Sequence, residues 1–172
     1  MARGHLSAEF VQVYVPTGFA SGDEERGTLA LALPDCLRWD YLSPYRKSFL
    51  LCGSRAWSWV EGEPQGQRLD VEARDEAGLD LLLRPADQLR SRYRAAFADG
   101  ETGELAILLQ PTVAGSAIIE AELRLDPQRQ ELLSVRTRDV EGNETRFWFS
   151  GYRPLADPDP FSPPRGIEWK EP

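Results

Sequence analysis

The sequence is poor in the residues that build most catalytic and metal sites. It holds one histidine, His5, two cysteines and one methionine among 172 residues. His5 stands near a chain end, where fraying makes it a poor position for a catalytic base. One histidine and two cysteines are too few for a zinc site. We therefore expect no catalytic residues, no metal and no cofactor.

Enzyme signatures are also missing. The chain has no Gly-x-Ser-x-Gly elbow, phosphate-binding glycine loop, dinucleotide fingerprint or His-Glu-x-x-His pair. One enzymatic alternative stays open, a carboxylate-dependent hydrolase. The 28 acidic residues can form a carboxylate pair, whose separation the sequence does not give.

Excess positive charge and long apolar runs are absent as well. Lysine and arginine total 20 against 28 acidic residues, a net charge of -8, and the basic residues are scattered. We expect no nucleic-acid partner and no docking to anionic lipid headgroups.

Apolar runs fall far short of the roughly 20 residues that cross a bilayer, so we expect no integral membrane segment. The opening residues lack the apolar stretch of a secretory signal, which predicts a cytosolic protein or an exported one whose leader has been removed.

The dominant positive signal is alternation of apolar and polar residues, which is typical of strands with one apolar and one wet face. From Ile119 to Leu125, apolar residues alternate with glutamate and arginine. Length and even composition predict one domain over residues 1–172. The class is mainly β, with roughly eleven strands. The predicted strands are 10–15, 28–33, 37–41, 48–51, 56–60, 67–73, 93–98, 105–110, 119–125, 133–138 and 144–149, with a possible edge strand at 167–169.

One segment follows a helical period instead. Leu79, Leu82 and Leu83 fall on one stripe at helical spacing between Asp75 and residue 89. Pro85 suits the first turn of a second short helix. We predict an amphipathic helical insert between strands.

The two cysteines are predicted to lie opposite each other. A turn at residues 43–45 sets Trp39 opposite Phe49 and Cys36 opposite Cys52, with the two pairs on opposite faces. Directly opposed residues lie within the Cα separation that a disulfide accepts. Cys36 and Cys52 therefore form either a disulfide or two reduced thiols.

Many large apolar side chains are assigned to one side of the sheet. Such a set usually forms a core, and a ligand-binding face is the alternative. One short helical insert offers little cover, so the sheet must close on itself or leave an apolar concavity that needs a guest or a lid. Trp148 is assigned to the opposite face. The set comprises Leu37, Trp39, Phe49, Leu51, Trp57, Trp59, Leu123, Val135, Phe147 and Phe149.

Four stretches resemble a known family in the expected order. Ser7–Gln12 is similar to the family's opening, a phenylalanine two residues before a glutamine. Residues 27–44 match a strand of small residues, a proline, an aromatic strand and a proline turn. Leu51–Trp59 and Phe161–Glu168 are similar to a glycine-tryptophan strand and to the closing segment. The family is LolA, the periplasmic carriers of outer-membrane lipoproteins.

The resemblance implies a half-open antiparallel β-barrel, closed by short helices that form a lid over an apolar cavity. It implies a periplasmic protein that shields the acyl chains of lipoproteins, or a related lipid, between an inner-membrane exporter and an outer-membrane receptor. Leu31 and Ile119 then join the apolar set as acyl-cavity residues, and Leu79, Leu82 and Leu83 are the lid candidates.

Two features depart from the family pattern. Leu33 stands where the family carries an arginine that holds the lid closed, and only nine residues precede the opening phenylalanine. Lid closure is therefore expected to differ. The alternative function is an envelope ligand-sensing or protein-interaction module on the same scaffold.

Overall fold

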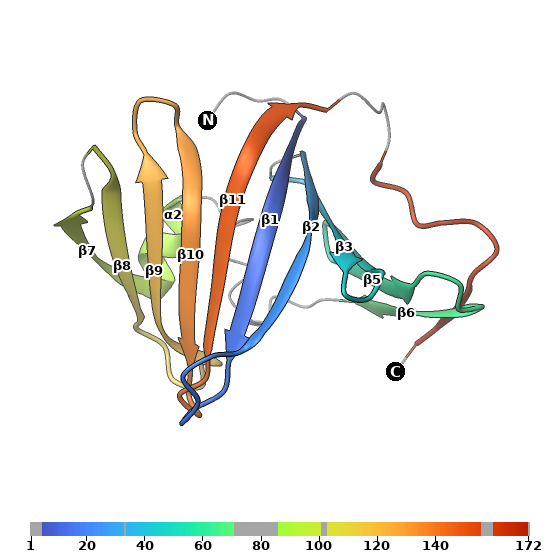
Figure 1. The fold of residues 1–172 in the computed structure, drawn as a ribbon, viewed down its shortest axis with the longest axis horizontal. Helices are drawn as coiled ribbons and strands as arrows, with labels where there is room; N and C mark the ends of the chain where they lie inside the picture. Colours follow the sequence, from blue (N-terminus) through green and yellow to red (C-terminus); the bar gives the residue numbers. More distant parts are fainter. Residues whose placement is uncertain (1–4, 33, 71–85, 101–102, 156–159, 172) are drawn as a thin grey trace. The chain divides into compact units, whose positions relative to one another are not determined.

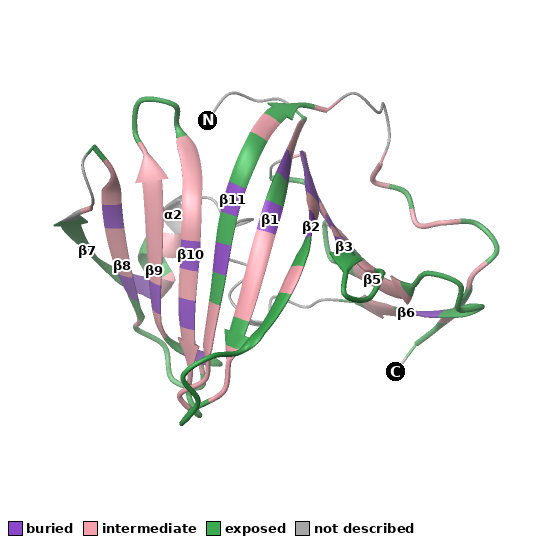
Figure 2. Ribbon diagram, viewed as in Figure 1, coloured by how far each residue is buried: buried purple, intermediate pink, exposed green. Residues whose placement is uncertain are grey.

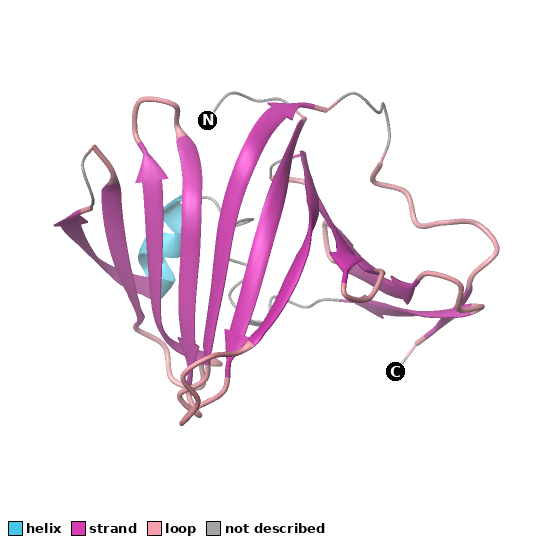
Figure 3. Ribbon diagram, in the orientation of Figure 1, coloured by secondary structure: helices cyan, strands magenta, loops and turns pink. Residues whose placement is uncertain are grey.

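The computed structural model describes residues 5–32, 34–70, 86–100, 103–155 and 160–171. Strands dominate these residues, and one helix, α2 (Ala86–Arg92), lies among them (Figure 3). It begins directly after Pro85, where a second short helix was predicted. None of the described helical residues forms a segment able to span a membrane.

Twelve strands form one open sheet (Figure 1). Their order is β12-β6-β5-β4-β3-β2-β1-β11-β10-β9-β8-β7. The predicted class, mainly β with one open sheet, is confirmed, and all its neighbouring strands for which a pairing is given are antiparallel except β12, which pairs in parallel with β6. The strands are β1 (Leu6–Val15), β2 (Asp23–Ala32), β3 (Cys36–Ser43), β4 (Lys47–Cys52), β5 (Arg55–Val60), β6 (Gln65–Asp70), β7 (Tyr93–Asp99), β8 (Leu105–Pro111), β9 (Ile118–Asp126), β10 (Glu131–Asp139), β11 (Glu144–Pro154) and β12 (Glu168–Lys170).

Contacts divide the chain into two units. The first comprises Val11–Glu24 and Asp75–Ser150, and the second comprises Ala2–Phe10, Glu25–Arg74 and Gly151–Pro172. Strands β1, β2 and β11 contribute residues to both. A single domain over residues 1–172 stays a prediction.

The first unit contains the predicted meander of β9, β10 and β11. Val135 of β10 stands opposite Leu123 of β9 and Phe147 of β11. The β9–β10 turn is fixed by Asp126, whose carboxylate accepts the backbone N–H groups of Gln128 and residue 129. Buried positions recur along β10 and β11 (Figure 2), because alternation directs every second side chain to one face.

The core of the first unit includes a cluster on β7, β8 and β9. Leu89 of α2, together with Ile107 and Leu123, packs against this cluster. A helix therefore covers part of the face that the alternation of β8 and β9 makes apolar. The buried cluster comprises Tyr93, Leu109, Ile118 and Ala121.

The second unit contains β3 and β4 in the predicted register. Trp39 stands opposite Phe49, and Cys36 stands opposite Cys52. Pairing with β2 places Leu29 opposite Trp39. Even and odd positions of β3 therefore face opposite sides of the sheet, as predicted.

The C-terminal segment covers one face of the second unit. The Pro160 C=O accepts a 3.0 Å hydrogen bond from the guanidinium of Arg38. Trp169 of β12 packs edge-on against Trp59 of β5. Leu50 of β4 stands opposite Arg38 on this face and is only 1% exposed. This side of the sheet is therefore a packed layer.

Candidate functional site

The other face of the second unit carries the predicted acyl-binding residues of β2, β3 and β4. Leu31 lies opposite Leu37, which lies opposite Leu51. Trp39, which follows Leu37 on the same face of β3, is only 2% exposed. Leu31 and Leu37 are buried as well, whereas Leu51 is half-buried. The structure brings these residues together on one apolar surface.

Phe49 is the exception to burial on this face. Although it stands opposite buried Trp39, 43% of its surface is exposed. A groove of about 340 Å³ lies beside it, lined also by Ser58, Val60 and Gln67 and by other residues of β4, β5, β6 and β12. An exposed aromatic ring next to a groove is a surface that an apolar guest can cover.

The face assignment was wrong for Trp57 and Trp59. Phe49 pairs with Ser58, so both tryptophans lie on the face opposite Phe49, where Trp169 of the C-terminal segment packs against Trp59. The cause is the two-residue β4–β5 turn, in which Gly53 takes a positive φ of 59°. Such a turn pairs odd-numbered residues with even-numbered ones, and one step of register reverses every side chain.

The first unit carries the remaining predicted residues. Val135, Phe147 and Phe149 are buried, and the two phenylalanine rings stack at 6.1 Å. Leu123 is half-buried opposite Val135. Trp148 lies between these two phenylalanines in the sequence and was predicted to face the other way. It is 45% exposed. The alternation of β11 is confirmed.

The assignment was wrong for Ile119. It is 48% exposed, whereas its neighbour Ile118 is buried in the core cluster. The register shifts between the pairs Arg138–Glu120 and Asp139–Ile118. A bulge at this point inserts one residue and turns Ile118, instead of Ile119, toward the core.

The opposite face of the first unit carries a network of ion pairs. Glu122 accepts 2.8 Å hydrogen bonds from the guanidinium groups of Arg124 and Arg136. Hydrogen bonding from Arg124, together with the charge of Arg136, holds the pKa of Glu122 below its ordinary value, although burial opposes the shift. Glu144 joins the network through Arg136 at 3.6 Å. Paired charges across strands stabilise this face as a water-facing surface.

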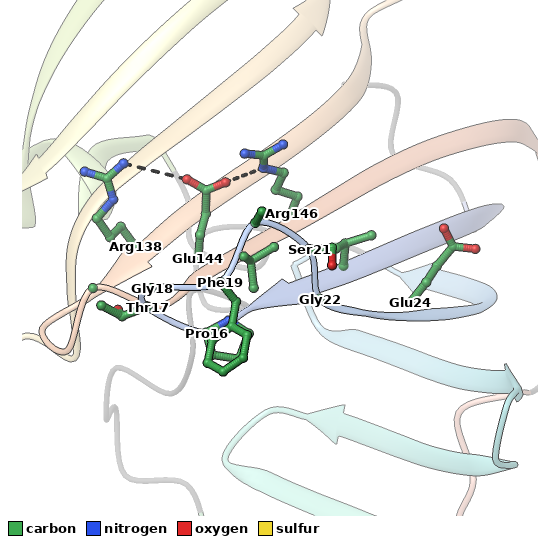
Figure 4. A pocket seen from close by; sticks show the side chains of 14 residues that line it. Pro16, Thr17, Gly18, Phe19, Ser21, Gly22, Glu24, Arg138, Glu144 and Arg146 are labelled. Atoms are coloured by element: carbon green, nitrogen blue, oxygen red, sulfur yellow. Dashed lines mark hydrogen bonds and ion pairs between the residues drawn. The ribbon is translucent and has the colours of Figure 1, made fainter.

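A hollow of about 650 Å³ adjoins this charged face. Glu144 lies between Arg138 and Arg146, with the β1–β2 loop around them (Figure 4). Thr17 fixes the loop, since its hydroxyl donates to the C=O of Glu141 at 2.8 Å. Because paired charges line the hollow, it does not suit a hydrocarbon chain.

Tyr41 links the apolar face to a charged pair. Its ring contacts Phe10 at 5.0 Å, and the Lys47 ammonium lies 4.4 Å from the ring centre. Lys47 also pairs with Glu25 at 2.7 Å. Burial raises the pKa of Tyr41, nearby Glu25 raises it further, and a hydrogen bond with Trp39 opposes the shift. Tyr41 is therefore neutral near pH 7.

The remaining predictions concern the two cysteines, the lid candidates and metal binding. The structure joins Cys36 and Cys52 in a disulfide with a Cα separation of 4.2 Å. The lid candidates Leu79, Leu82 and Leu83, and the departure at Leu33, lie outside the described residues. Within the part of the chain that the structure describes, no group of His, Cys, Asp or Glu could hold a metal ion.

Sequence reasoning missed three residues that complete the apolar face of the second unit. Phe10, Leu29 and Tyr41 are buried around Trp39, and the rings of Phe10 and Trp39 lie 4.9 Å apart. Leu29 and Tyr41 share the odd-numbered alternation that identified Leu37 and Trp39. For these two residues the signal was therefore present in the sequence.

The family model described as outer membrane lipoprotein carrier protein LolA matches residues 4–162. The chain belongs to the LolA family. An outer-membrane lipoprotein carrier protein of Chromobacterium violaceum is 28% identical over 167 residues, covering 95% of this chain and 79% of that protein. Its counterpart in Methylococcus capsulatus is 26% identical, with the same two coverages of 95% and 79%.

A solved structure shows the fold shared with this LolA-family chain. An uncharacterized conserved protein from Thermus thermophilus superposes with a TM-score of 0.60 at 12% identity. The likeness covers 99% of this chain and 92% of that one. At this identity the likeness shows the fold alone. The predicted LolA resemblance is confirmed by the family model.

Proposed function

We propose that this chain carries lipoproteins in the cell envelope by shielding their acyl chains against the apolar face around Trp39 and Phe49. The observation that carries the proposal is Phe49, which is 43% exposed on the same face as buried Trp39 and beside a groove. Membership of the LolA family supports it, as do relatives named outer-membrane lipoprotein carrier proteins. No catalysis is part of this role.

Burial of hydrocarbon explains why such a carrier must cover its cargo. Each methylene group removed from water contributes about 0.8 kcal/mol. Acyl chains of a lipoprotein therefore cannot leave the carrier into water on a useful time scale. Transfer must run directly from an inner-membrane exporter to the carrier, and from the carrier to an outer-membrane receptor. We place the protein in the periplasm, and the disulfide between Cys36 and Cys52 is compatible with that oxidising compartment.

Lipid extraction tests the proposal without knowledge of the partners. Protein purified from envelope fractions should release acylated peptide or lipid that mass spectrometry detects. In vitro, a fluorescent tripalmitoylated peptide should bind the purified protein and lose its accessibility to a water-soluble quencher.

Two glutamate variants locate the bound chain. Phe49→Glu places a charge on the exposed part of the apolar face and should weaken binding of the tripalmitoylated peptide by about tenfold or more. Trp148→Glu is the matched control, because Trp148 has a similar exposure of 45% but lies on the opposite face from Phe147. Equal affinity in both variants would remove the basis of the site. Absence of acyl cargo from native protein would favour the ligand-sensing alternative.

A further inference from the structure

The two edges of the sheet differ in their protection. β12 is three residues long, carries Glu168 and Lys170, and pairs in parallel with β6. β7, at the other edge, has seven residues and pairs with β8 without a bulge. Short length, charged side chains and bulges keep edge strands from pairing with other chains. Two of the seven residues of β7 are charged, Arg94 and Asp99, against two of three in β12.

Two hydrogen bonds fix which backbone groups of β7 face β8. The Thr112 N–H donates to the Arg92 C=O at 2.8 Å, and the Gly100 N–H donates to the Glu104 C=O at 3.3 Å. Both bonds fall on the register that β7 and β8 share. Bonded and non-bonded pairs alternate along antiparallel strands, so the even-numbered residues of β7 bond to β8.

The backbone N–H and C=O groups of the odd-numbered residues of β7 point away from β8. The N–H and C=O groups of Ala95 and Phe97 are directed away from β8, toward the edge. Among the residues that the structure describes, no strand pairs with that side of β7. The side chain of Phe97 is 70% exposed. Exposed backbone groups in a regular strand form a template for another strand.

We propose that β7 pairs antiparallel with β7 of a second copy, centred on Ala96. This register sets Ala95 opposite the partner's Phe97, so that hydrogen bonds form between their outward groups and each ring covers an alanine methyl group. Arg94 stands opposite the partner's Ala98, and like charges never face each other. The strand is therefore complementary to itself, which the two-fold symmetry of a homodimer requires.

The dimer should be weak and sensitive to salt. Seven residues per copy give a contact smaller than most stable interfaces, so the dimer forms at high protein concentration. Each copy carries a net charge of -8, and salt screens the repulsion between the two. Association should therefore strengthen between low and physiological ionic strength, in contrast to an interface held by ion pairs.

A pair of cysteine variants tests the register. The described chain has no free cysteine, so Ala96→Cys introduces one reactive thiol. Ala96 faces the partner's Ala96 in a non-bonded pair, where Cα atoms lie about 4.5 Å apart and a disulfide can form. Ala98→Cys is the control, because Ala98 faces the partner's Arg94. Mild oxidation should cross-link Ala96→Cys at least about tenfold faster than Ala98→Cys.

Sedimentation velocity over a concentration series tests the dimer itself. Ala95→Pro removes an outward N–H without loss of a bond to β8 and should abolish association. Ala95→Ser keeps that N–H and should associate like the unmodified protein. Circular dichroism checks that each variant folds. A monomer at every concentration would overturn the proposal, and the edge would then bind a strand of another protein or none. Equal cross-linking of the two cysteine variants would overturn it as well.

Discussion

Trp59 of β5 and Trp169 of β12 pack edge to face with ring centroids 6.1 Å apart, which joins the last strand to the face of the sheet opposite Phe49. The contact needs Gly66, because a Cβ atom there would lie 2.5 Å from the ring of Trp169. Arg38 adds a cation–π contact with Trp59 at 5.4 Å. Trp59, which sequence reasoning assigned to a lipid cavity, thus holds the C-terminal segment in place.

Removal of Trp169 should destabilise the second unit. Trp169→Ala eliminates a half-buried ring that contacts Trp59, and we expect the free energy of unfolding to fall by about 2–4 kcal/mol. Chemical denaturation measures the change. Trp148→Ala, at a partly exposed position on β11, should cost less than half as much. Similar losses in the two variants would show that the contact between the tryptophans adds no stability.

The disulfide should stabilise the β3–β4 hairpin. Cys36 and Cys52 are separated by 16 positions, and closure of a loop of this length contributes about 3 kcal/mol. Cys36→Ser combined with Cys52→Ser should lower the free energy of unfolding by about this amount. Reduction of the unmodified protein should give the same midpoint of denaturation as the double variant. A midpoint that reduction leaves unchanged would contradict the prediction.

Alternation and one well-placed turn were enough to predict strand register and the face of each side chain in part of the sheet. Both sufficed for the β3–β4 register, in which Trp39 faces Phe49, and for the outward position of Trp148. They failed where the backbone adds or omits a residue. The tight turn at Gly53 reversed Trp57 and Trp59, and a bulge reversed Ile119. Turn length and bulges are set by backbone geometry that hydrophobic periodicity does not record.

The bulge in β9 gives adjacent isoleucines opposite roles. Ile118→Ala removes a buried side chain from the core cluster and should lower the free energy of unfolding by about 2–4 kcal/mol. Ile119→Ala changes an exposed side chain and should cost under about 1 kcal/mol. Thermal or urea denaturation compares the two. A larger loss for Ile119→Ala would mean that Ile119 faces the core, as the sequence predicted, and that Ile118 does not.

Glu122 should make stability depend on acid pH. Hydrogen bonds from Arg124, with the charge of Arg136, hold its folded-state pKa below the ordinary value of 4.5. The folded protein therefore binds this proton less readily than the unfolded chain does, so its contribution is present above about pH 4.5 and is lost as pH falls through the lowered pKa. Glu122→Gln should lower the free energy of unfolding near neutral pH, and the difference from the unmodified protein should shrink below pH 4.5. Glu131→Gln, which removes one carboxylate of β10, is the control for the change in net charge. Denaturation at several pH values measures both, and a difference for Glu122→Gln that stays constant down to about pH 3 would contradict the role of the ion pairs.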